Sequence, residues 1–93
     1  MTIQAGTITG GWKIAQTMGA TSVATPMNGA PLPCTVYLNS SDATRKIEYS
    51  VDGTTYYTAA YDASTASQLV TKVMGQISHI RFTGLTTDTW GIL

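Results

Sequence analysis

The sequence predicts an all-β fold: a single small β-sandwich or jelly-roll-like domain of about seven or eight short strands. Residues 45–61 alternate polar and apolar side chains around Asp52-Gly53, the strongest short-range signal for a β-hairpin, and Gly53 can adopt the positive φ of a tight turn. Turn residues recur at roughly ten-residue intervals between short runs rich in Thr, Val, Ile and Tyr. A chain of 93 residues has room for one core, so residues 1–93 are expected to form one domain.

The N-terminal part of the chain predicts two strands and a loop. Residues 2–9 alternate weakly, which fits either an edge strand or an extended arm over residues 1–11. Strands are expected at residues 12–18 and 19–25. Residues 26–33 hold all 3 prolines of the chain. We expect a loop there, because proline cannot donate a hydrogen bond to a strand ladder.

The middle of the chain contains the predicted hairpin. A strand is expected at residues 34–38, followed by a polar turn at residues 39–42. In the first strand of the hairpin, Ile47, Tyr49 and Val51 are expected on one face, because successive side chains of a strand point to opposite faces. The alternating residues Lys46, Glu48 and Ser50 are expected on the other face.

The C-terminal part of the chain contains one ambiguous segment. Residues 62–74 carry apolar side chains at helical spacing, but their threonines and valines favour a strand. We favour the strand because the neighbouring segments are strands, and the helix stays open. Residues 78–83 predict a strand with Ile80 and Phe82 facing inward, and residues 89–93 predict the last strand.

The charge content limits the possible partners. Only 11% of the residues are charged, against ~25% in an average soluble domain. The five Lys and Arg residues are scattered, so we expect no nucleic-acid partner. A surface with so few charges suits a protein that works inside an assembly and forms homo-oligomers. Alternatively, the many Ser and Thr side chains hydrate the surface of a free protein.

The sequence shows no signal for export or membrane insertion. The N-terminal residues lack the basic and apolar regions of a signal peptide, and no run approaches the ~20 apolar residues of a membrane helix. We therefore expect synthesis in a cytoplasm and no membrane partner. The single cysteine, Cys34, excludes an intrachain disulfide, and its position at the start of a strand predicts a buried thiol.

The residues needed for catalysis are scarce. His79 is the only histidine and lies in a predicted strand, and with Cys34 it cannot supply a zinc site. No serine lies on a recognisable nucleophile elbow, and the carboxylates are spread over turns and one strand. We therefore expect no enzymatic activity, no cofactor and no metal.

One motif has a structural interpretation. Residues 50–56, SVDGTTY, resemble the Asp-box hairpin of sialidase-type propellers, although the glycine comes one residue early and Tyr56 replaces a tryptophan. A single copy in so short a chain is interpreted as a folding device. Asp52 is expected to cap backbone amides, and Tyr56 is expected to pack over the turn.

The tyrosines leave a second functional class open. Tyr56, Tyr57 and Tyr61 lie close together, and Tyr49 is expected across the hairpin. Sugar-binding sandwiches use exposed aromatic side chains, so a carbohydrate-binding module is an alternative. In the simpler interpretation, Tyr49 and one of Tyr56 and Tyr57 face the core.

Three segments of the C-terminal half resemble small all-β structural proteins of tailed bacteriophages: IEYSVDGTTYYTAAY, SHIRFTG and DTWGIL. The resemblance implies a virion protein that is assembled in the host cytoplasm. Its expected role is capsid decoration (cement), in which it binds the major capsid protein or other virion proteins. A head–tail or tail component is the alternative within that class.

Apolar residues at the two ends of the chain and in the proline loop are the candidates for contact with such a partner. These partner-binding candidates are Ile3, Ile8, Leu32, Trp90, Ile92 and Leu93. Each of them is equally compatible with a place in the core. The apolar C-terminus is expected to dock either on its own sheet or on a neighbouring molecule.

Overall fold

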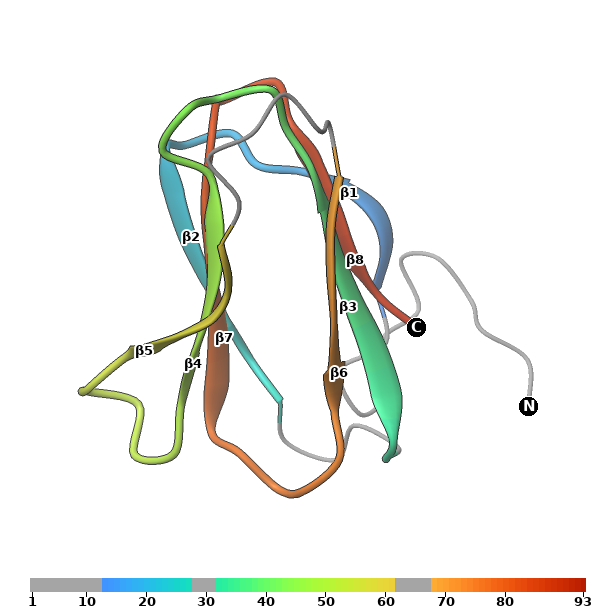
Figure 1. Cartoon of the computed structure of the whole chain (residues 1–93), viewed down its shortest axis with the longest axis vertical. Coiled ribbons are helices and arrows are strands. Elements are labelled where there is room, and N and C mark those ends of the chain that lie inside the picture. The colour runs from blue at the N-terminus through green and yellow to red at the C-terminus, as the bar shows by residue number, and fades with distance from the viewer. Residues whose placement is uncertain (1–12, 28–31, 62–67) are drawn as a thin grey trace.

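Two four-stranded antiparallel sheets pack face to face as a sandwich in the computed structural model (Figure 1). The structure describes residues 13–27, 32–61 and 68–93, and within these ranges it contains eight strands and no helix. The predicted all-β sandwich is therefore confirmed. The strands are β1 (Lys13–Thr17), β2 (Ser22–Pro26), β3 (Cys34–Asn39), β4 (Lys46–Ser50), β5 (Tyr57–Tyr61), β6 (Gln68–Val73), β7 (His79–Thr83) and β8 (Thr89–Ile92).

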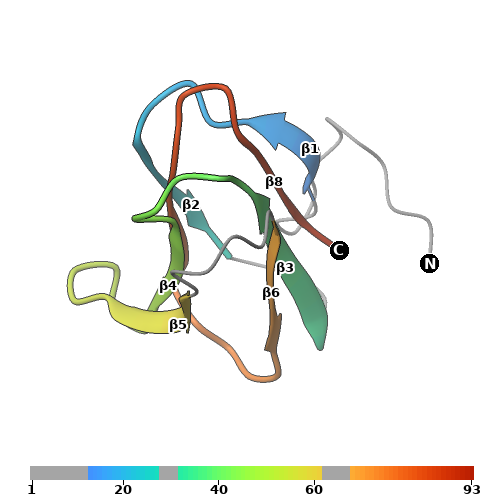
Figure 2. The ribbon, with the colours of Figure 1, turned by 45° about the horizontal axis from the view of Figure 1, so that its top comes forward.

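The strand order is that of a jelly roll. Sheet A has the order β1-β8-β3-β6, and sheet B has the order β2-β7-β4-β5. The first strand pairs with the eighth, the second with the seventh, the third with the sixth and the fourth with the fifth. The chain is thus one long hairpin rolled up so that successive strands lie in alternate layers, except β4 and β5, which pair within sheet B (Figures 1 and 2).

Alternation along the strands builds the core between the two sheets. Ile80 and Phe82 of β7 face inward as predicted, and both are fully buried. Phe82 stacks on Trp90 of β8, with 4.7 Å between the ring centroids, and so joins the two sheets. The hydrophobic core consists of Met18, Met27, Cys34, Val36, Leu38, Ile47, Leu69, Val73, Ile80, Phe82, Trp90 and Ile92.

The loops at one end of the sandwich are tied together by backbone hydrogen bonds. Met18 N donates to Asp88 O at 2.8 Å, and Gly19 N donates to Thr86 O at 2.9 Å. The carboxylate of Asp88 in turn accepts from Leu85 N at 2.5 Å. These bonds hold the β1–β2 and β7–β8 connections together at this end of the sandwich.

The ambiguous segment is a strand where the structure describes it. β6 covers Gln68–Val73, whereas residues 62–67 lie outside the described residues. Leu69 and Val73 alternate into the core, and every residue of β6 has a partner on β3. This ladder stabilises the strand form over the helix that the apolar spacing also permits.

Two local expectations need correction. Val51 was expected to continue the first strand of the hairpin on the same face as Ile47 and Tyr49, but β4 ends at Ser50, and Val51 lies 64% exposed in the connection 51–56. Pro26 was expected in the loop, but it is the last residue of β2 and pairs with His79. β2 is an edge strand of sheet B, which is where proline is tolerated in a sheet.

Candidate interaction surface

A cleft opens along the side of the sandwich where the edge strands β5 and β6 face each other. Its volume is about 410 Å³. Tyr49, Val73, Ile77 and Ile80 supply apolar lining, and among the described residues Lys72 is the only charged one that borders the cleft. A cleft with this lining favours an apolar occupant over an ionic one.

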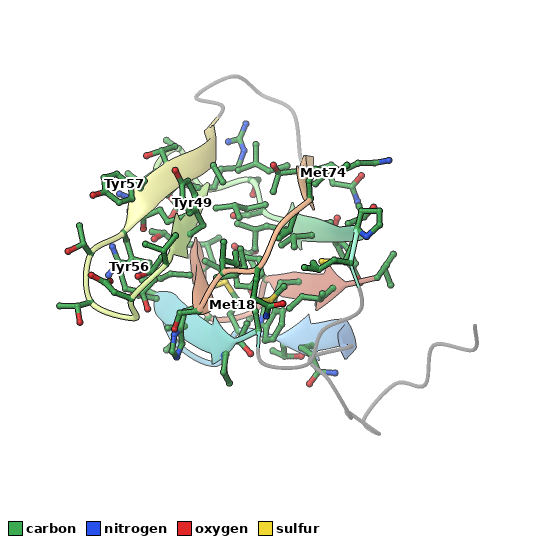
Figure 3. The ribbon with its side chains drawn as sticks, turned by 90° about the horizontal axis from the view of Figure 1, so that it is seen from below. Met18, Tyr49, Tyr56, Tyr57 and Met74 are labelled. Atoms are coloured by element: carbon green, nitrogen blue, oxygen red, sulfur yellow. The ribbon has the colours of Figure 1, made fainter. Side chains whose placement is uncertain are left out.

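Large apolar side chains are left outside the core on and beside the edge strands β5 and β6. Of the five exposed large apolar residues in the described part of the chain, three belong to β5, to β6 or to the residue after β6: Tyr57 (53% exposed), Val70 (54%) and Met74 (71%). In Figure 3, Tyr49, Tyr56 and Tyr57 lie together, and Met74 lies apart from them. Of the exposed residues, Met74 lines the cleft, whereas Val70 lies on the outer face of sheet A. An exposed apolar side chain beside an apolar cleft is typical of a docking surface.

The tyrosines occupy different environments. Tyr49 packs partly buried against the core, and its ring centroid lies 5.7 Å from that of the half-exposed Tyr57 on the neighbouring strand. Tyr56 lies under the guanidinium of Arg81, whose Cζ is 4.0 Å from the ring centroid. The expectation that Tyr49 packs against the core is therefore confirmed, whereas Tyr57 is exposed at the edge strand.

The loop after β4 has the capping role that its motif predicts. Asp52 Oδ1 accepts from Thr54 N at 2.8 Å and from Thr55 N at 2.9 Å, and Ser50 Oγ accepts from Gly53 N at 2.8 Å. The amides of Thr55 and Thr54, together with the hydroxyl of Ser50, hold the pKa of Asp52 below its usual range. Gly53 has a φ of 81°. The Asp52 carboxylate is thus used to shape the loop.

Sheet B carries a charged cluster on its outer face. Arg81 of β7 binds Glu48 of β4 through two hydrogen bonds, Nε to Oε1 at 3.0 Å and Nη2 to Oε2 at 3.2 Å. Glu48 was expected on the face of β4 opposite to Ile47, and it lies there, but its side chain is only 7% exposed because Arg81 covers it. The cluster holds β4 to β7 and leaves no free carboxylate at this position.

His79 and Cys34 are the two side chains with the most reactive chemistry. His79 Nδ1 lies 2.6 Å from Ser78 Oγ. Cys34 is buried as expected, and burial raises the pKa of its thiol. Among the described residues, no three His, Cys, Asp or Glu side chains are grouped so that they could hold a metal ion.

None of the described segments forms a helix that is long and apolar enough to cross a membrane.

The structure places two of the partner-binding candidates in the core. Trp90 is 5% exposed and Ile92 is fully buried, because β8 lies between β1 and β3 in sheet A. Trp90 and Ile92 are therefore core residues, and neither side chain is available for a partner on the surface of this chain. The C-terminal strand docks on its own sheet, which is one of the two arrangements that the sequence left open.

The other candidates have different positions. Leu32 is partly buried against the core. Leu93 is partly exposed and borders a shallow hollow of about 340 Å³ on the outer face of sheet A, together with Tyr37 and Val70. Ile3 and Ile8 lie outside the described residues.

Sequence reasoning missed the exposure of Val70 and Met74. Val70 occupies an outward position of β6, between the inward-facing Leu69 and Thr71. Its alternation would have shown that it faces outward, if the segment had been assigned to a strand with a known inner face. Met74 follows the last residue of β6, and no signal in the sequence distinguishes it from a core methionine such as Met18.

Comparison with the known protein families, with curated protein sequences and with solved structures finds no match for this chain.

Proposed function

We propose that this chain is a non-enzymatic structural protein of a tailed-bacteriophage virion, where it acts as a capsid decoration (cement) protein that binds major capsid subunits. The observation that carries the proposal is the apolar cleft between the edge strands β5 and β6. The resemblance of three C-terminal segments to small phage structural proteins supports the choice of partner.

The cleft supports a specific mode of binding. An extended partner segment can place apolar side chains in a pocket beside a sheet edge. Here the pocket is lined by Val73, Ile77 and Ile80, and Met74 stands exposed at its border. Burial of such apolar area contributes about 25 cal/mol per Å², so a partner that covers the cleft would stabilise both proteins.

The carboxylates support a structural role for the chain. Glu48 is paired with Arg81, Asp52 binds the amides of its own loop, and Asp88 binds the amide of Leu85. General acid–base catalysis needs a carboxyl group that is held ready for a substrate. In the described part of the chain, these three groups are instead engaged in holding strands and loops together.

Copy number in the particle tests the proposal most directly. The chain should be quantified against the major capsid protein in purified particles of the source virus. Hundreds of copies per particle are expected for a decoration protein, whereas a dozen or fewer would indicate a head–tail or tail component. If the chain is absent from the particle, the virion role is wrong.

A pair of variants tests the cleft. Met74→Gln removes the exposed apolar side chain beside the cleft. Leu85→Gln is the control, because it removes another exposed apolar side chain, which lies after the end of β7 and does not line the cleft. In co-sedimentation with capsids that lack the protein, Met74→Gln should bind at least ~10-fold more weakly than the wild type. Leu85→Gln should bind normally. Equal binding by all three proteins would exclude the cleft as the contact.

A carbohydrate-binding module is the second candidate, and the exposed Tyr57 ring beside Tyr49 favours it. Aromatic faces of this kind can stack on sugar rings. Titration with a panel of glycans should quench tyrosine fluorescence in the wild type and not in Tyr57→Ala if this candidate is right. Particle binding without any glycan response would reject it.

A further inference from the structure

The four sheet edges of the sandwich are not equally protected against pairing with another strand. The ladder of β1 is interrupted by a bulge between Lys13 and Gln16. β2 ends in Pro26, and β5 carries a bulge at Ala59, which has no opposite residue on β4. Bulges, prolines and charged side chains are among the devices by which natural sheets prevent edge-to-edge association. Among the described edge strands, β6 is the one without a bulge or a proline, and its one charged residue is Lys72.

The ladder of β6 is regular along its whole length. All 6 residues of β6 pair with β3 without a register shift, from Gln68 opposite Asn39 to Val73 opposite Cys34. No described strand pairs with the other side of β6. A straight edge of this kind presents a row of backbone donors and acceptors to a further strand.

We propose that β6 pairs antiparallel with β6 of a second copy of this chain, so that two copies of sheet A join into one continuous sheet across a two-fold axis at Val70. A two-fold axis requires the surface to be complementary to itself. With the axis at Val70, the two Val70 side chains lie opposite each other, Leu69 lies opposite Thr71, and Gln68 lies opposite Lys72.

The side chains of the outer face fit this register. Val70 is 54% exposed, and its twin would cover it with an apolar group. Gln68 donates its Nε2 to Asn39 Oδ1 at 2.7 Å, which leaves its Oε1 to accept from the ammonium of Lys72 in the second copy. A register centred on Lys72 would instead place two ammonium groups opposite each other, which destabilises a strand pair.

The surroundings of Val70 favour the same contact. Val70 lies opposite Tyr37 of β3, and both border the shallow hollow on the outer face of sheet A. The formal net charge of the chain is zero, so two copies do not repel each other strongly. The inward-facing Leu69 and Thr71 of the second copy would extend the sheet A wall beside the cleft.

The inference rests on the proposed function, because a dimer would give a decoration protein two equivalent capsid contacts. It is tested on the purified chain without particles, so that the two proposals can fail separately. A wild-type chain that stays monomeric but binds particles would overturn the dimer and leave the decoration role standing.

Two lysine variants form the first experiment. Val70→Lys places a charge at the proposed axis, and Val51→Lys places the same charge at a similarly exposed valine in the β4–β5 connection. Sedimentation equilibrium between about 1 and 200 μM should show a wild-type dimer, at least ~10-fold weaker association for Val70→Lys, and no change for Val51→Lys. Monomeric wild type, or equal weakening by both variants, would overturn the proposal.

Disulfide trapping tests the register. Opposite Cα atoms in an antiparallel pair are about 4.5–5.5 Å apart, which is within the range a disulfide spans. Under mild oxidation, Val70→Cys should form an interchain disulfide readily, whereas Val51→Cys should not. The native Cys34 is buried and should not compete. Failure of Val70→Cys to cross-link, with its circular dichroism spectrum unchanged, would reject an axis at this residue.

Discussion

At the scale of single residues, Gly91 shows how closely the outer face of sheet A is packed. It lies opposite Tyr37 on the neighbouring strand, and a Cβ at Gly91 would lie 2.6 Å from both Cζ and Oη of that ring. Glycine is therefore required here by a close approach, and the ring of Tyr37 covers the backbone that glycine leaves bare.

Gly91→Ala should destabilise the protein by about 1–3 kcal/mol, because the Tyr37 ring must move out of its position. Gly75→Ala is the matched control, since a Cβ there would meet no atom within 4 Å. Its effect should stay within about 0.5 kcal/mol. Urea unfolding of both variants measures the difference, and equal midpoints would contradict the contact with Tyr37.

Asp52 gives the β4–β5 connection a pH dependence. Hydrogen bonds from Thr55 N, Thr54 N and Ser50 Oγ lower the pKa of Asp52 in the folded protein. Its stabilising contribution is therefore present above the unfolded pKa of about 4 and is lost as pH falls through the lower folded pKa.

Asp52→Asn should consequently be less stable than the wild type near neutral pH, and the two should converge in acid. Unfolding midpoints in urea at about pH 7 and about pH 2.5 measure this convergence. A difference in midpoint that is the same at both pH values would show that the ionised carboxylate has no special role in the loop.

At the scale of elements, one charged pair on the outer face of sheet B joins the two central strands of that sheet. Glu48 of β4 is nearly buried beneath Arg81 of β7, which also covers the ring of Tyr56. Removing the guanidinium would leave a carboxylate that is largely shielded from water and has lost its bidentate partner.

Arg81→Ala should therefore cost about 2–3 kcal/mol of stability. Lys46→Ala is the control, because Lys46 lies 3.8 Å from the same carboxylate but is 37% exposed, and its loss should cost under about 0.5 kcal/mol. A double-mutant cycle of Arg81→Ala with Glu48→Gln should give a coupling free energy well above zero. Additive effects would mean that the pair does not stabilise the sheet.

At the scale of the whole molecule, the jelly-roll topology makes the last strand central. β8 lies between β1 and β3 and contributes Trp90 and Ile92 to the core. A chain that ends at Asp88 would lose the strand that pairs with both β1 and β3, and with it two large core side chains.

We expect a chain that ends at Asp88 to remain unfolded, as measured by the loss of near-ultraviolet circular dichroism and of amide dispersion in NMR spectra. Leu93→Ser is the control, because the backbone bonds of Leu93 N to Thr35 O at 2.7 Å and of Thr35 N to Leu93 O at 2.8 Å do not need its side chain. This variant should fold. A folded chain without residues 89–93 would contradict the central position of β8.

The sequence predicts much of the fold but little of the candidate interaction surface. The strands could be located because alternation and turn residues act over a few neighbouring positions, as in Ile80 and Phe82. Val51 was misplaced because the end of a strand depends on where its ladder stops. Trp90 and Ile92 were expected as partner contacts as readily as core residues, because a C-terminal strand can lie either at the edge or in the middle of a sheet.

The exposure of Val70 and Met74 depends on the tertiary structure. Val70 is exposed because it points to the outer face of sheet A on an edge strand, and Met74 is exposed because it follows the end of that strand. The two edges β5 and β6 face each other only because the rolled hairpin brings them to the same side, so the cleft has no local signal in the chain.

The sequence by itself determined the all-β class, the position of most strands, the Asp-Gly hairpin and the need for one shared core. The tertiary structure alone decided which strands form the sheet edges, and therefore which apolar side chains lie outside the core. The physical reason is the sequence distance over which each interaction acts. Strand propensity and turn chemistry act between near neighbours, whereas sheet order depends on pairs as distant as Lys13 and Ile92 and on the apolar surface that the whole chain can bury.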